Sequence, residues 1–391
     1  MRLFLVLLIS ALLAAQQLEV LLEQADAAFR QGDLENAAAL SQKVLAREPG
    51  AVHAHLILGV IAAQNSQWTA CERHFQTVAR LQPANPYSYF YLGQARLYQR
   101  QWEAAIQYFN QAKARGYPDT DRLTVELALA QNEANRPKLA LAGLASVPVP
   151  GEPQRAAQYY GIIAFAQDKL NQTGEAIAAA RKAIELDDSN PHYWDFLIDA
   201  LIRTDQAPAA LAEAIRAQKK FPDRADTQYQ FALASHHVVE SPLSKLAYRN
   251  LAEAEPGTAR VALAEGLLLR KQGQNEQALA AFKRAAQRGA PDSHLLLGIV
   301  YKENGDYPAA EREYLEASRL NPRNGQAQLE LGKLLFARGD LAGARLRLEQ
   351  AVAIMPEAST AHYQLGLVYR RLGLAAKAEE HLERSRNSSA R

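Results

Sequence analysis

The stretch 325–356, GQAQLELGKLLFARGDLAGARLRLEQAVAIMP, decides the fold of this chain. On each side of Gly339-Asp340, large and small residues recur three and four positions apart, a spacing that places them on one face of a helix. The Gly-Asp pair ends the first helix and begins the second. Pro356 closes the second helix because proline cannot continue one. The stretch therefore predicts a helical hairpin.

The same hairpin pattern recurs along the chain. In 291–322, PDSHLLLGIVYKENGDYPAAEREYLEASRLNP, Gly298 takes the place of Gly332, and residues of the same kind follow at 3, 12, 16, 19 and 24 positions in both stretches. A separation of 34 residues recurs between closing prolines, as in Pro49/Pro83, Pro222/Pro256 and Pro322/Pro356. Small residues let two antiparallel helices approach, and a bulky residue fills the space beside them. The period is therefore one hairpin.

This pattern resembles the tetratricopeptide repeat family, whose unit is a 34-residue helical hairpin with these small and large positions. The resemblance implies an all-α, right-handed superhelical solenoid of about eleven helix–turn–helix repeats, each stabilised mainly by its neighbours. We expect the repeats to begin near Leu18, Val52, Pro86, Thr120, Ala157, Pro191, Ala225, Ala259, Pro291, Gly325 and Ser359.

Two repeats depart from the pattern. The fourth ends in the proline cluster 147–153, VPVPGEP, which is typical of an irregular connection. We expect it to separate an N-terminal block of four repeats, 18–153, the last of them degenerate, from a C-terminal block of seven, 157–391. In the seventh repeat, 236–242 replaces the usual Gly-Asp turn. A bend or a specialised contact is expected at these two places.

The first residues have the features of an export signal. Arg2 precedes residues 3–13, which are apolar apart from Ser10, and Ala14-Ala15 follow. A short positive start, a short apolar stretch and small residues are typical of a secretory signal peptide, and a membrane-spanning helix needs about 20 residues. We expect 1–15 to be a signal peptide and the protein to be periplasmic or secreted. The alternatives are an uncleaved anchor and a first buried helix.

Composition excludes several classes of protein. Apolar residues make up 48% of the chain, which is enough for a large core. The formal net charge is only +2, and no other stretch is apolar enough to cross a membrane. We therefore expect no nucleic-acid partner and no transmembrane span. Cys71 is the only cysteine, so no intramolecular disulfide can form, and its place in the repeat predicts a buried side chain.

The sequence contains no catalytic or nucleotide-binding signature. There is no G-x-S-x-G, P-loop, G-x-G-x-x-G or H-E-x-x-H motif. His237 and Glu240 have the spacing of an H-x-x-E metal site, but Ser241 stands where a second ligand would be needed, so a turn is the better interpretation. We expect no catalytic residue, no cofactor and no metal.

The resemblance implies that the second, fifth, ninth and twelfth residues of each first helix line a concave groove. The candidate groove-binding residues are Tyr87, Phe90, Gln94, His192, Asp195, Asp199, Asp226, Tyr229, Arg260, Arg270, Tyr363 and Arg370. Their chemistry changes from aromatic to acidic and then to basic along the chain, which suits an amphipathic or extended peptide. The alternative is that these side chains pack against neighbouring turns or face water.

These observations favour a non-catalytic protein–protein interaction scaffold that binds peptide or protein segments in its groove, in periplasmic assembly or secretion. The alternative is an accessory subunit of a glycan-processing or other envelope enzyme, with saccharide in the groove. Self-association is a third possibility. Groove composition limits the partner's chemistry but does not name the partner.

Overall fold

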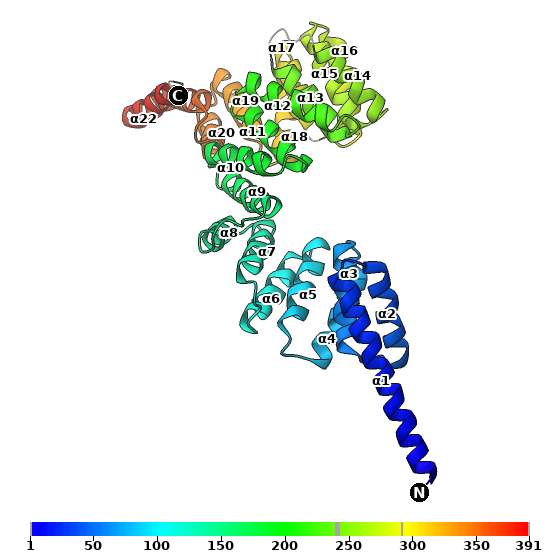
Figure 1. Cartoon of the computed structure of the whole chain (residues 1–391). Coiled ribbons are helices and arrows are strands. Elements are labelled where there is room, and N and C mark those ends of the chain that lie inside the picture. The colour runs from blue at the N-terminus through cyan, green and yellow to red at the C-terminus, as the bar shows by residue number, and fades with distance from the viewer. Residues whose placement is uncertain (1, 239–242, 291, 390–391) are drawn as a thin grey trace. The chain divides into compact units, whose positions relative to one another are not determined.

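The computed structural model describes residues 2–238, 243–290 and 292–389, which form α-helices joined by short turns (Figure 1). The chain divides into two compact units, unit 1 (Met1–Leu170) and unit 2 (Asn171–Arg391). The two blocks expected from the sequence place the helix 153–169 with the second block, whereas the compact units place it with the first.

Unit 1 consists of nine helices within the described residues. They are α1 (Arg2–Arg30), α2 (Leu34–Arg47), α3 (Val52–Gln64), α4 (Trp68–Leu81), α5 (Pro86–Tyr98), α6 (Trp102–Ala114), α7 (Thr120–Glu133), α8 (Pro137–Leu144) and α9 (Pro153–Lys169). The N-terminal part of α1 extends beyond the helices that pack on the rest of it (Figure 1). No helix in the described part of the chain is long and apolar enough to cross a membrane.

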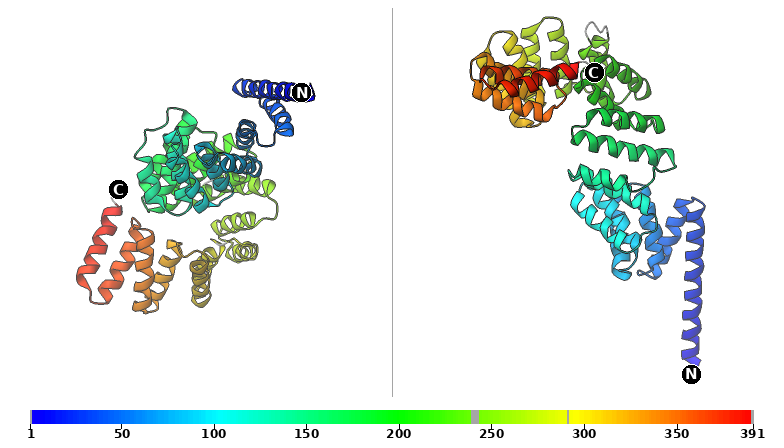
Figure 2. Two further views of the ribbon diagram at one scale, coloured as in Figure 1. Left: turned by 90° about the horizontal axis from the view of Figure 1, so that it is seen from below. Right: turned by 90° about the vertical axis from the view of Figure 1, so that its left-hand side faces the viewer.

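Unit 2 contains thirteen helices within its described residues (Figure 2). They are α10 (Thr173–Leu186), α11 (Pro191–Arg203), α12 (Ala207–Lys220), α13 (Ala225–His237), α14 (Ser244–Ala254), α15 (Ala259–Lys271), α16 (Asn275–Gln287), α17 (Asp292–Glu303), α18 (Tyr307–Leu320), α19 (Gly325–Ala337), α20 (Leu341–Ile354), α21 (Ser359–Arg371) and α22 (Ala375–Ser389). The predicted all-α repeat architecture is confirmed. Eight first helices begin at the expected residue: Val52, Pro86, Thr120, Pro191, Ala225, Ala259, Gly325 and Ser359.

The hairpins are held together by the small-and-large packing that the sequence predicts. A side-chain carbon added at Gly298 would lie 2.5 Å from the ring of Tyr314, and one at Gly93 would lie 2.6 Å from the ring of Phe109. Both rings are fully buried. The glycines let the two helices of a hairpin approach until an aromatic ring fills the interface, so a larger residue there forces a shift of packed atoms.

The Gly-Asp turns also form as predicted. Gly305 and Gly339 have φ angles of +82° and +84°, a conformation that favours glycine. The carboxylates of Asp306 and Asp340 then cap the next helix, because each accepts a hydrogen bond from a backbone N–H three residues on (3.0 and 2.8 Å).

A hydrogen bond recurs between successive hairpins, from the side chain of the fourth residue of a first helix to a backbone carbonyl before that helix. The Tyr89 hydroxyl donates to the Pro83 carbonyl (3.0 Å), and the Trp194 indole N–H donates to the Asp188 carbonyl (3.0 Å). The same bond is made, at 2.9 Å, by His55 to Pro49 and by His362 to Pro356. Each bond satisfies a carbonyl at the end of the preceding hairpin.

The two irregular repeats lie where the sequence places them. Helix α8 has only eight residues, and an irregular connection, 145–152, leads from it to α9. In the seventh repeat α13 ends at His237, and the remainder of the predicted departure, 239–242, lies outside the described residues. The predicted H-x-x-E spacing includes Glu240 and Ser241, so it also lies outside them.

First helices lie on the inner side of each unit. Within unit 2, α11 packs on α13, α13 on α15 and α19 on α21, whereas successive second helices do not pack on one another at comparable density. Unit 1 shows the same arrangement for α3, α5, α7 and α9. The exposed faces of the first helices therefore line the concave side of each unit.

Candidate functional site

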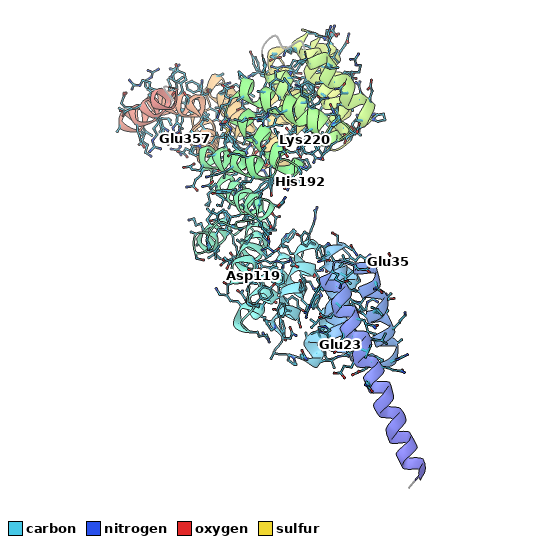
Figure 3. All side chains as sticks on the ribbon, in the orientation of Figure 1. Glu23, Glu35, Asp119, His192, Lys220 and Glu357 are labelled. Atoms are coloured by element: carbon cyan, nitrogen blue, oxygen red, sulfur yellow. The ribbon has the colours of Figure 1, made fainter. Side chains whose placement is uncertain are left out.

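The exposed face of α11 carries the residues that the sequence predicts for the groove. His192 and Asp199 are exposed and Asp195 is partly buried, while most of the helix between them packs into the core. His192 is labelled in Figure 3. Because these residues lie on one face of a helix on the inner side of unit 2, they are accessible to a partner on that side.

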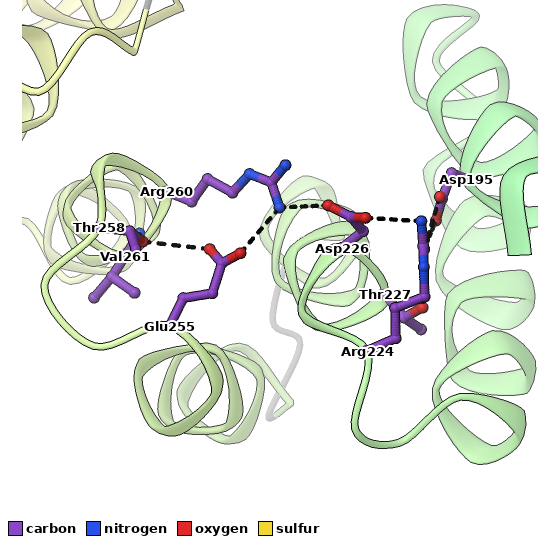
Figure 4. Close-up of polar contacts among 8 residues, drawn as sticks. All are labelled: Asp195, Arg224, Asp226, Thr227, Glu255, Thr258, Arg260 and Val261. Atoms are coloured by element: carbon purple, nitrogen blue, oxygen red, sulfur yellow. Dashed lines mark hydrogen bonds and ion pairs between the residues drawn. The ribbon is translucent and has the colours of Figure 1, made fainter. Parts of the chain in front are cut away.

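A chain of ion pairs links α11, α13 and α15 across this inner side (Figure 4). The Arg224 guanidinium pairs with Asp195 (2.7 Å) and with Asp226 (2.7 Å). The Arg260 guanidinium pairs with Asp226 (2.5 Å) and with Glu255 (3.3 Å). Two of the predicted acidic groups are thus neutralised within the chain, and their first role is to connect neighbouring hairpins.

The pKa values of the two aspartates differ. Burial raises the pKa of Asp226, but the hydrogen bond from Arg260 and the charge of Arg224 outweigh it, and the pKa is lowered. Burial raises the pKa of Asp195 by more than the hydrogen bond from Arg224 lowers it. Arg224, which the groove pattern does not indicate, lies in the turn before α13 and is shared by both carboxylates.

Beyond this chain of ion pairs, charged side chains from three other first helices act on Tyr229 of α13. The Arg260 guanidinium lies 5.2 Å from the centre of the Tyr229 ring. Burial and the charges of Asp292 and Asp199 raise the pKa of the Tyr229 hydroxyl. Asp292 begins α17 and Asp199 lies on α11, so charges from helices three hairpins apart act on one hydroxyl group. We call Asp199, Tyr229, Arg260 and Asp292 the inner cluster.

Asp292, the first residue of α17, is influenced by Asp199 of α11. Its side chain is exposed to water, yet the surrounding protein, together with the charge of Asp199, raises its pKa. Asp199 accepts a hydrogen bond from Arg203 (2.8 Å), and no ion pair joins Asp292 to another described residue.

The remaining predicted residues of unit 2 lie apart from the inner cluster. Arg270 pairs with Glu303 of the next hairpin (2.7 Å). Tyr363 and Arg370 are exposed on α21. These residues lie on the expected helices; among the described residues, it is Arg260 that contacts the Tyr229 ring.

In unit 1 the three predicted residues of α5 have different surroundings. Tyr87 is 43% exposed and meets the ring of Tyr117 edge-on at 5.4 Å. Phe90 is fully buried and stacks on the same ring at 4.3 Å, so the prediction that it faces the groove is corrected. Gln94 is also buried and donates a hydrogen bond to Glu126 (3.0 Å). Only Tyr87 remains accessible.

Unit 1 contains a pocket that the groove pattern does not indicate. Its volume is about 510 Å³, and α7, the irregular connection after α8 and the start of α9 form its walls. Asp119, labelled in Figure 3, lies at its edge. The proline cluster 147–153 was the available sequence signal, because it predicts an irregular connection at this place.

Neither reactive chemistry nor a metal-binding cluster is evident in the described part of the chain. Among its residues, no group of three or more His, Cys, Asp or Glu side chains is placed to hold a metal ion. Cys71 is buried, as predicted, and burial raises the pKa of its thiol to about 12. A thiol with such a pKa is protonated at neutral pH and is a poor nucleophile.

Comparison with protein families agrees with the repeat pattern. A profile described as tetratricopeptide repeat matches overlapping segments that cover residues 22–154 and 263–355, together more than half of the chain. A second profile with the same description matches residues 157–190 and 359–385.

Individual relatives share only parts of their length with this chain. Anaphase-promoting complex subunit 3 of Schizosaccharomyces pombe is 26% identical over 210 residues, 52% of this chain and 31% of that protein. Type IV pilus assembly protein PilF of Pseudomonas aeruginosa is 29% identical over 124 residues, 31% of this chain and 49% of that protein. The chain thus spans less than half the length of these curated relatives. The crystal structure of the APC/C hetero-tetramer Cut9-Hcn1 aligns with 97% of this chain and 89% of that one, with a TM-score of 0.48 and 14% identity.

Proposed function

We propose that this chain, which belongs to the tetratricopeptide repeat family and is a protein-interaction scaffold, binds an extended partner segment at the inner cluster of unit 2 without itself catalysing a reaction. The observation that carries the proposal is the convergence of Asp199, Tyr229 and Asp292 from helices up to three hairpins apart. Concave surfaces of stacked hairpins are the binding surfaces of such solenoids. The inner cluster supplies an aromatic ring and carboxylates in such a surface.

The inner cluster favours a partner segment with a basic residue. Asp199 raises the pKa of Asp292, so the two carboxylates repel one another when both are ionised. A lysine or arginine of the partner would relieve this repulsion, and Tyr229 offers a face for its aliphatic part. The Arg203–Asp199 pair is half exposed on one helix, and such pairs contribute little, so Asp199 stays available.

Site-specific photo-crosslinking in the host tests where a partner binds. A benzophenone amino acid at His192, which is exposed on α11 about two turns before Asp199, is expected to crosslink to a defined segment of one partner protein. The same probe at Glu276, which is exposed on the second helix α16, is the control and is expected to give no such product. Equal crosslinking at both positions, or none at His192, would contradict the proposal.

Affinity measurements with the crosslinked segment test the chemistry. The double variant Asp199→Asn, Asp292→Asn is expected to weaken binding of the purified segment by about tenfold or more, because two facing carboxylates are lost. The matched control, Glu276→Gln with Glu316→Gln on outer helices, removes the same formal charge and is expected to leave affinity unchanged. An equal loss of affinity in both double variants would show that the effect comes from net charge alone.

The same proposal extends to location and role. We infer that the protein is exported and assists the assembly or secretion of envelope proteins. The apolar stretch after Arg2 and the likeness of part of the chain to a pilus assembly protein support this. N-terminal sequencing of the protein from fractionated host cells is expected to give Gln16 as the first residue, in the periplasmic or extracellular fraction. Cytosolic protein that begins at Met1 would contradict it.

A further inference from the structure

Glu126 on α7 is a buried carboxyl group whose hydrogen bonding is incomplete. Its side chain is almost wholly enclosed, and Gln94 Nε2 donates to one carboxyl oxygen, Oε1 (3.0 Å). The other oxygen, Oε2, is buried and has no hydrogen-bond partner. A buried carboxylate without a second donor or a cation carries a large desolvation cost. Burial accordingly raises the pKa of Glu126, even though the hydrogen bond from Gln94 and the charges of Arg122 and Arg155 lower it.

Glu126 forms part of the lining of the 510 Å³ pocket in unit 1. Apolar side chains cover one part of the wall: Val125, Pro148, Val149 and Pro150. Acidic side chains contribute another part: Asp119, Asp121 and Glu152. The pocket thus combines an apolar wall, an acidic edge and a buried acceptor atom without a partner. An occupant that suits all three has an aliphatic stem and a cationic end.

Two arginines also line the pocket, but both are held elsewhere. The Arg122 guanidinium lies 4.9 Å from the centre of the Phe90 ring and is hydrogen-bonded with Tyr91. Arg155 pairs with Glu152 (3.1 Å) and, more distantly, with Asp119 (3.9 Å). Neither donates to the free oxygen of Glu126.

The acidic groups also outnumber the basic ones. Asp119, Asp121, Glu126 and Glu152 face only the two guanidiniums of Arg122 and Arg155 in the lining. The pocket therefore retains an acidic excess, which favours a positively charged occupant.

Unit 2 shows which partner a buried glutamate takes in this fold. Glu330 on α19 is as deeply buried as Glu126. It accepts hydrogen bonds from the ammonium groups of Lys302 (2.6 Å) and Lys333 (2.7 Å), and these lower its pKa in spite of burial. Two ammonium groups of the chain are hydrogen-bonded to Glu330, whereas no described cation is hydrogen-bonded to Glu126, which lines a pocket instead.

We propose that this pocket binds the side chain of a lysine from a partner polypeptide, with the ammonium group at Glu126 and the methylene stem along Val125 and Val149. Lysine is favoured over arginine because Gln94 already occupies Oε1, which leaves a single carboxyl oxygen. An ammonium group needs only one acceptor, whereas the paired N–H groups of a guanidinium match two oxygens. The pocket lies wholly within unit 1, so the inference does not depend on the inner cluster of unit 2.

Methyl NMR of the full chain with labelled valines tests the proposal, because Val125 and Val149 report on the pocket directly. The probe is the capped pentapeptide acetyl-Gly-Gly-Lys-Gly-Gly-amide. The matched peptide carries norleucine, which keeps the stem and lacks the charge. The lysine peptide is expected to shift both valine signals saturably and to bind at least about fivefold more tightly than the norleucine peptide. Equal affinity for the two, or tighter binding of an arginine peptide, would overturn the proposal.

Variants identify the group that binds the ammonium. Glu126→Gln keeps the shape of the side chain. It is expected to weaken binding of the lysine peptide about tenfold while leaving the affinity for the norleucine peptide unchanged. The control, Glu103→Gln, removes an exposed carboxylate of the same unit that pairs with Arg136 on the surface, and is expected to change neither affinity. Unchanged lysine affinity in Glu126→Gln would overturn the assignment.

A second variant keeps the test independent of the buried position. Asp121→Asn, at the exposed edge of the pocket, is expected to weaken the lysine peptide about twofold to threefold without disturbing the fold, because a nearby charge is lost in a solvated setting. Unchanged affinity in this variant would count against the proposal. Failure of crosslinking at His192 would reject the proposed site in unit 2 and leave these measurements unaffected.

Discussion

Glu126 in unit 1 and Glu330 in unit 2 are both buried on first helices, but they differ in what surrounds them. Two lysine ammonium groups bind Glu330, and its pKa is lowered. A single amide binds Glu126, and burial raises its pKa. The comparison shows that the repeat tolerates a buried carboxyl group. The neighbouring residues decide whether it links two hairpins or keeps one oxygen without a hydrogen-bonded cation.

The difference follows from the regularity of the repeats. Lys302 lies on α17 and Glu330 on α19, so an undistorted stack brings the ammonium of one hairpin to the carboxylate of the next. After α7 the second helix, α8, is short, and the irregular connection leaves a pocket beside Glu126. A regular hairpin thus satisfies its buried charge internally, whereas the degenerate one leaves room for a partner.

The largest effect on stability is expected from removing the carboxylate of Glu330, to which two lysines are bound. Glu330→Gln leaves two partly buried ammonium groups without a counter-charge and should lower the free energy of unfolding by about 2–4 kcal/mol. Urea unfolding followed by circular dichroism measures it. The control Glu316→Gln, on the exposed face of α18, should show no measurable loss. A loss as small as that of the control would mean that the buried ion pairs contribute nothing net.

A lysine introduced beside Glu126 should give this glutamate the kind of partner that Glu330 already has. Gln94→Lys places an ammonium group where the amide now donates, and is expected to stabilise the chain by about 1 kcal/mol. It should also abolish binding of the lysine pentapeptide, because the charge of Glu126 is then neutralised within the chain. Destabilisation together with unchanged peptide binding would show that a missing cation is not what distinguishes Glu126.

Removing the charge of Glu126 should cost little or nothing. In Glu126→Gln the amide oxygen can still accept from Gln94, while the desolvation cost of a carboxylate disappears. The free energy of unfolding at pH 7 is expected to stay the same or to rise by up to about 1 kcal/mol, in the urea titration used for Glu330→Gln. A loss of the size expected for Glu330→Gln would mean that a cation of the chain stabilises the Glu126 carboxylate.

Acid should weaken both units through matching histidine pairs. The Nδ1 atoms of His55 and His74 lie 2.9 Å apart in unit 1, and those of His362 and His381 lie 2.9 Å apart in unit 2. His55 donates through Nε2 to a carbonyl, so in the neutral pair its Nδ1 accepts and His74 donates.

The pKa of His74 sets the pH range of this effect. Burial and the charge of His55 lower it from 6.5 to about 4. A lowered folded-state pKa gives stability that is complete above pH 6.5 and is lost as the pH falls towards 4. His74→Gln should therefore reduce the loss of stability between pH 7 and pH 5 by about 1 kcal/mol or less, in urea titrations at the two pH values. An unchanged loss would show that the pair is not protonated in this range.

The fold could be predicted from the sequence because its pattern is local. Helix periodicity, Gly-Asp turns and closing prolines each act within one hairpin, so they appear as a 34-residue repeat. The exposed groove residues of α11 follow from the same register. The burial of Phe90 could not be predicted from the register. The ring of Tyr117, which precedes the next hairpin, stacks on the Phe90 ring and covers it.

The chemistry between hairpins could not be predicted in this way. Arg224 lies in a turn outside the repeat register, yet it joins two predicted aspartates. Glu126 stands between Val125 and Leu127 in the degenerate repeat, where a charged residue amid apolar ones was the available signal. Whether such a residue finds a cation depends on the length of the next helix and the path of the connection after it, which no local pattern fixes.

The ionisation of the two buried glutamates is the most direct test of this account. Carboxyl ¹³C shifts of the glutamate-labelled chain, assigned with Glu126→Gln and Glu330→Gln, give each midpoint in a pH titration. We expect Glu126 to titrate above 4.5 and Glu330 below it, and saturating lysine pentapeptide to lower the Glu126 midpoint alone. Midpoints shifted in the same direction, or a Glu126 midpoint that the peptide leaves unchanged, would contradict the claim that Glu126 lacks a cation which a partner provides.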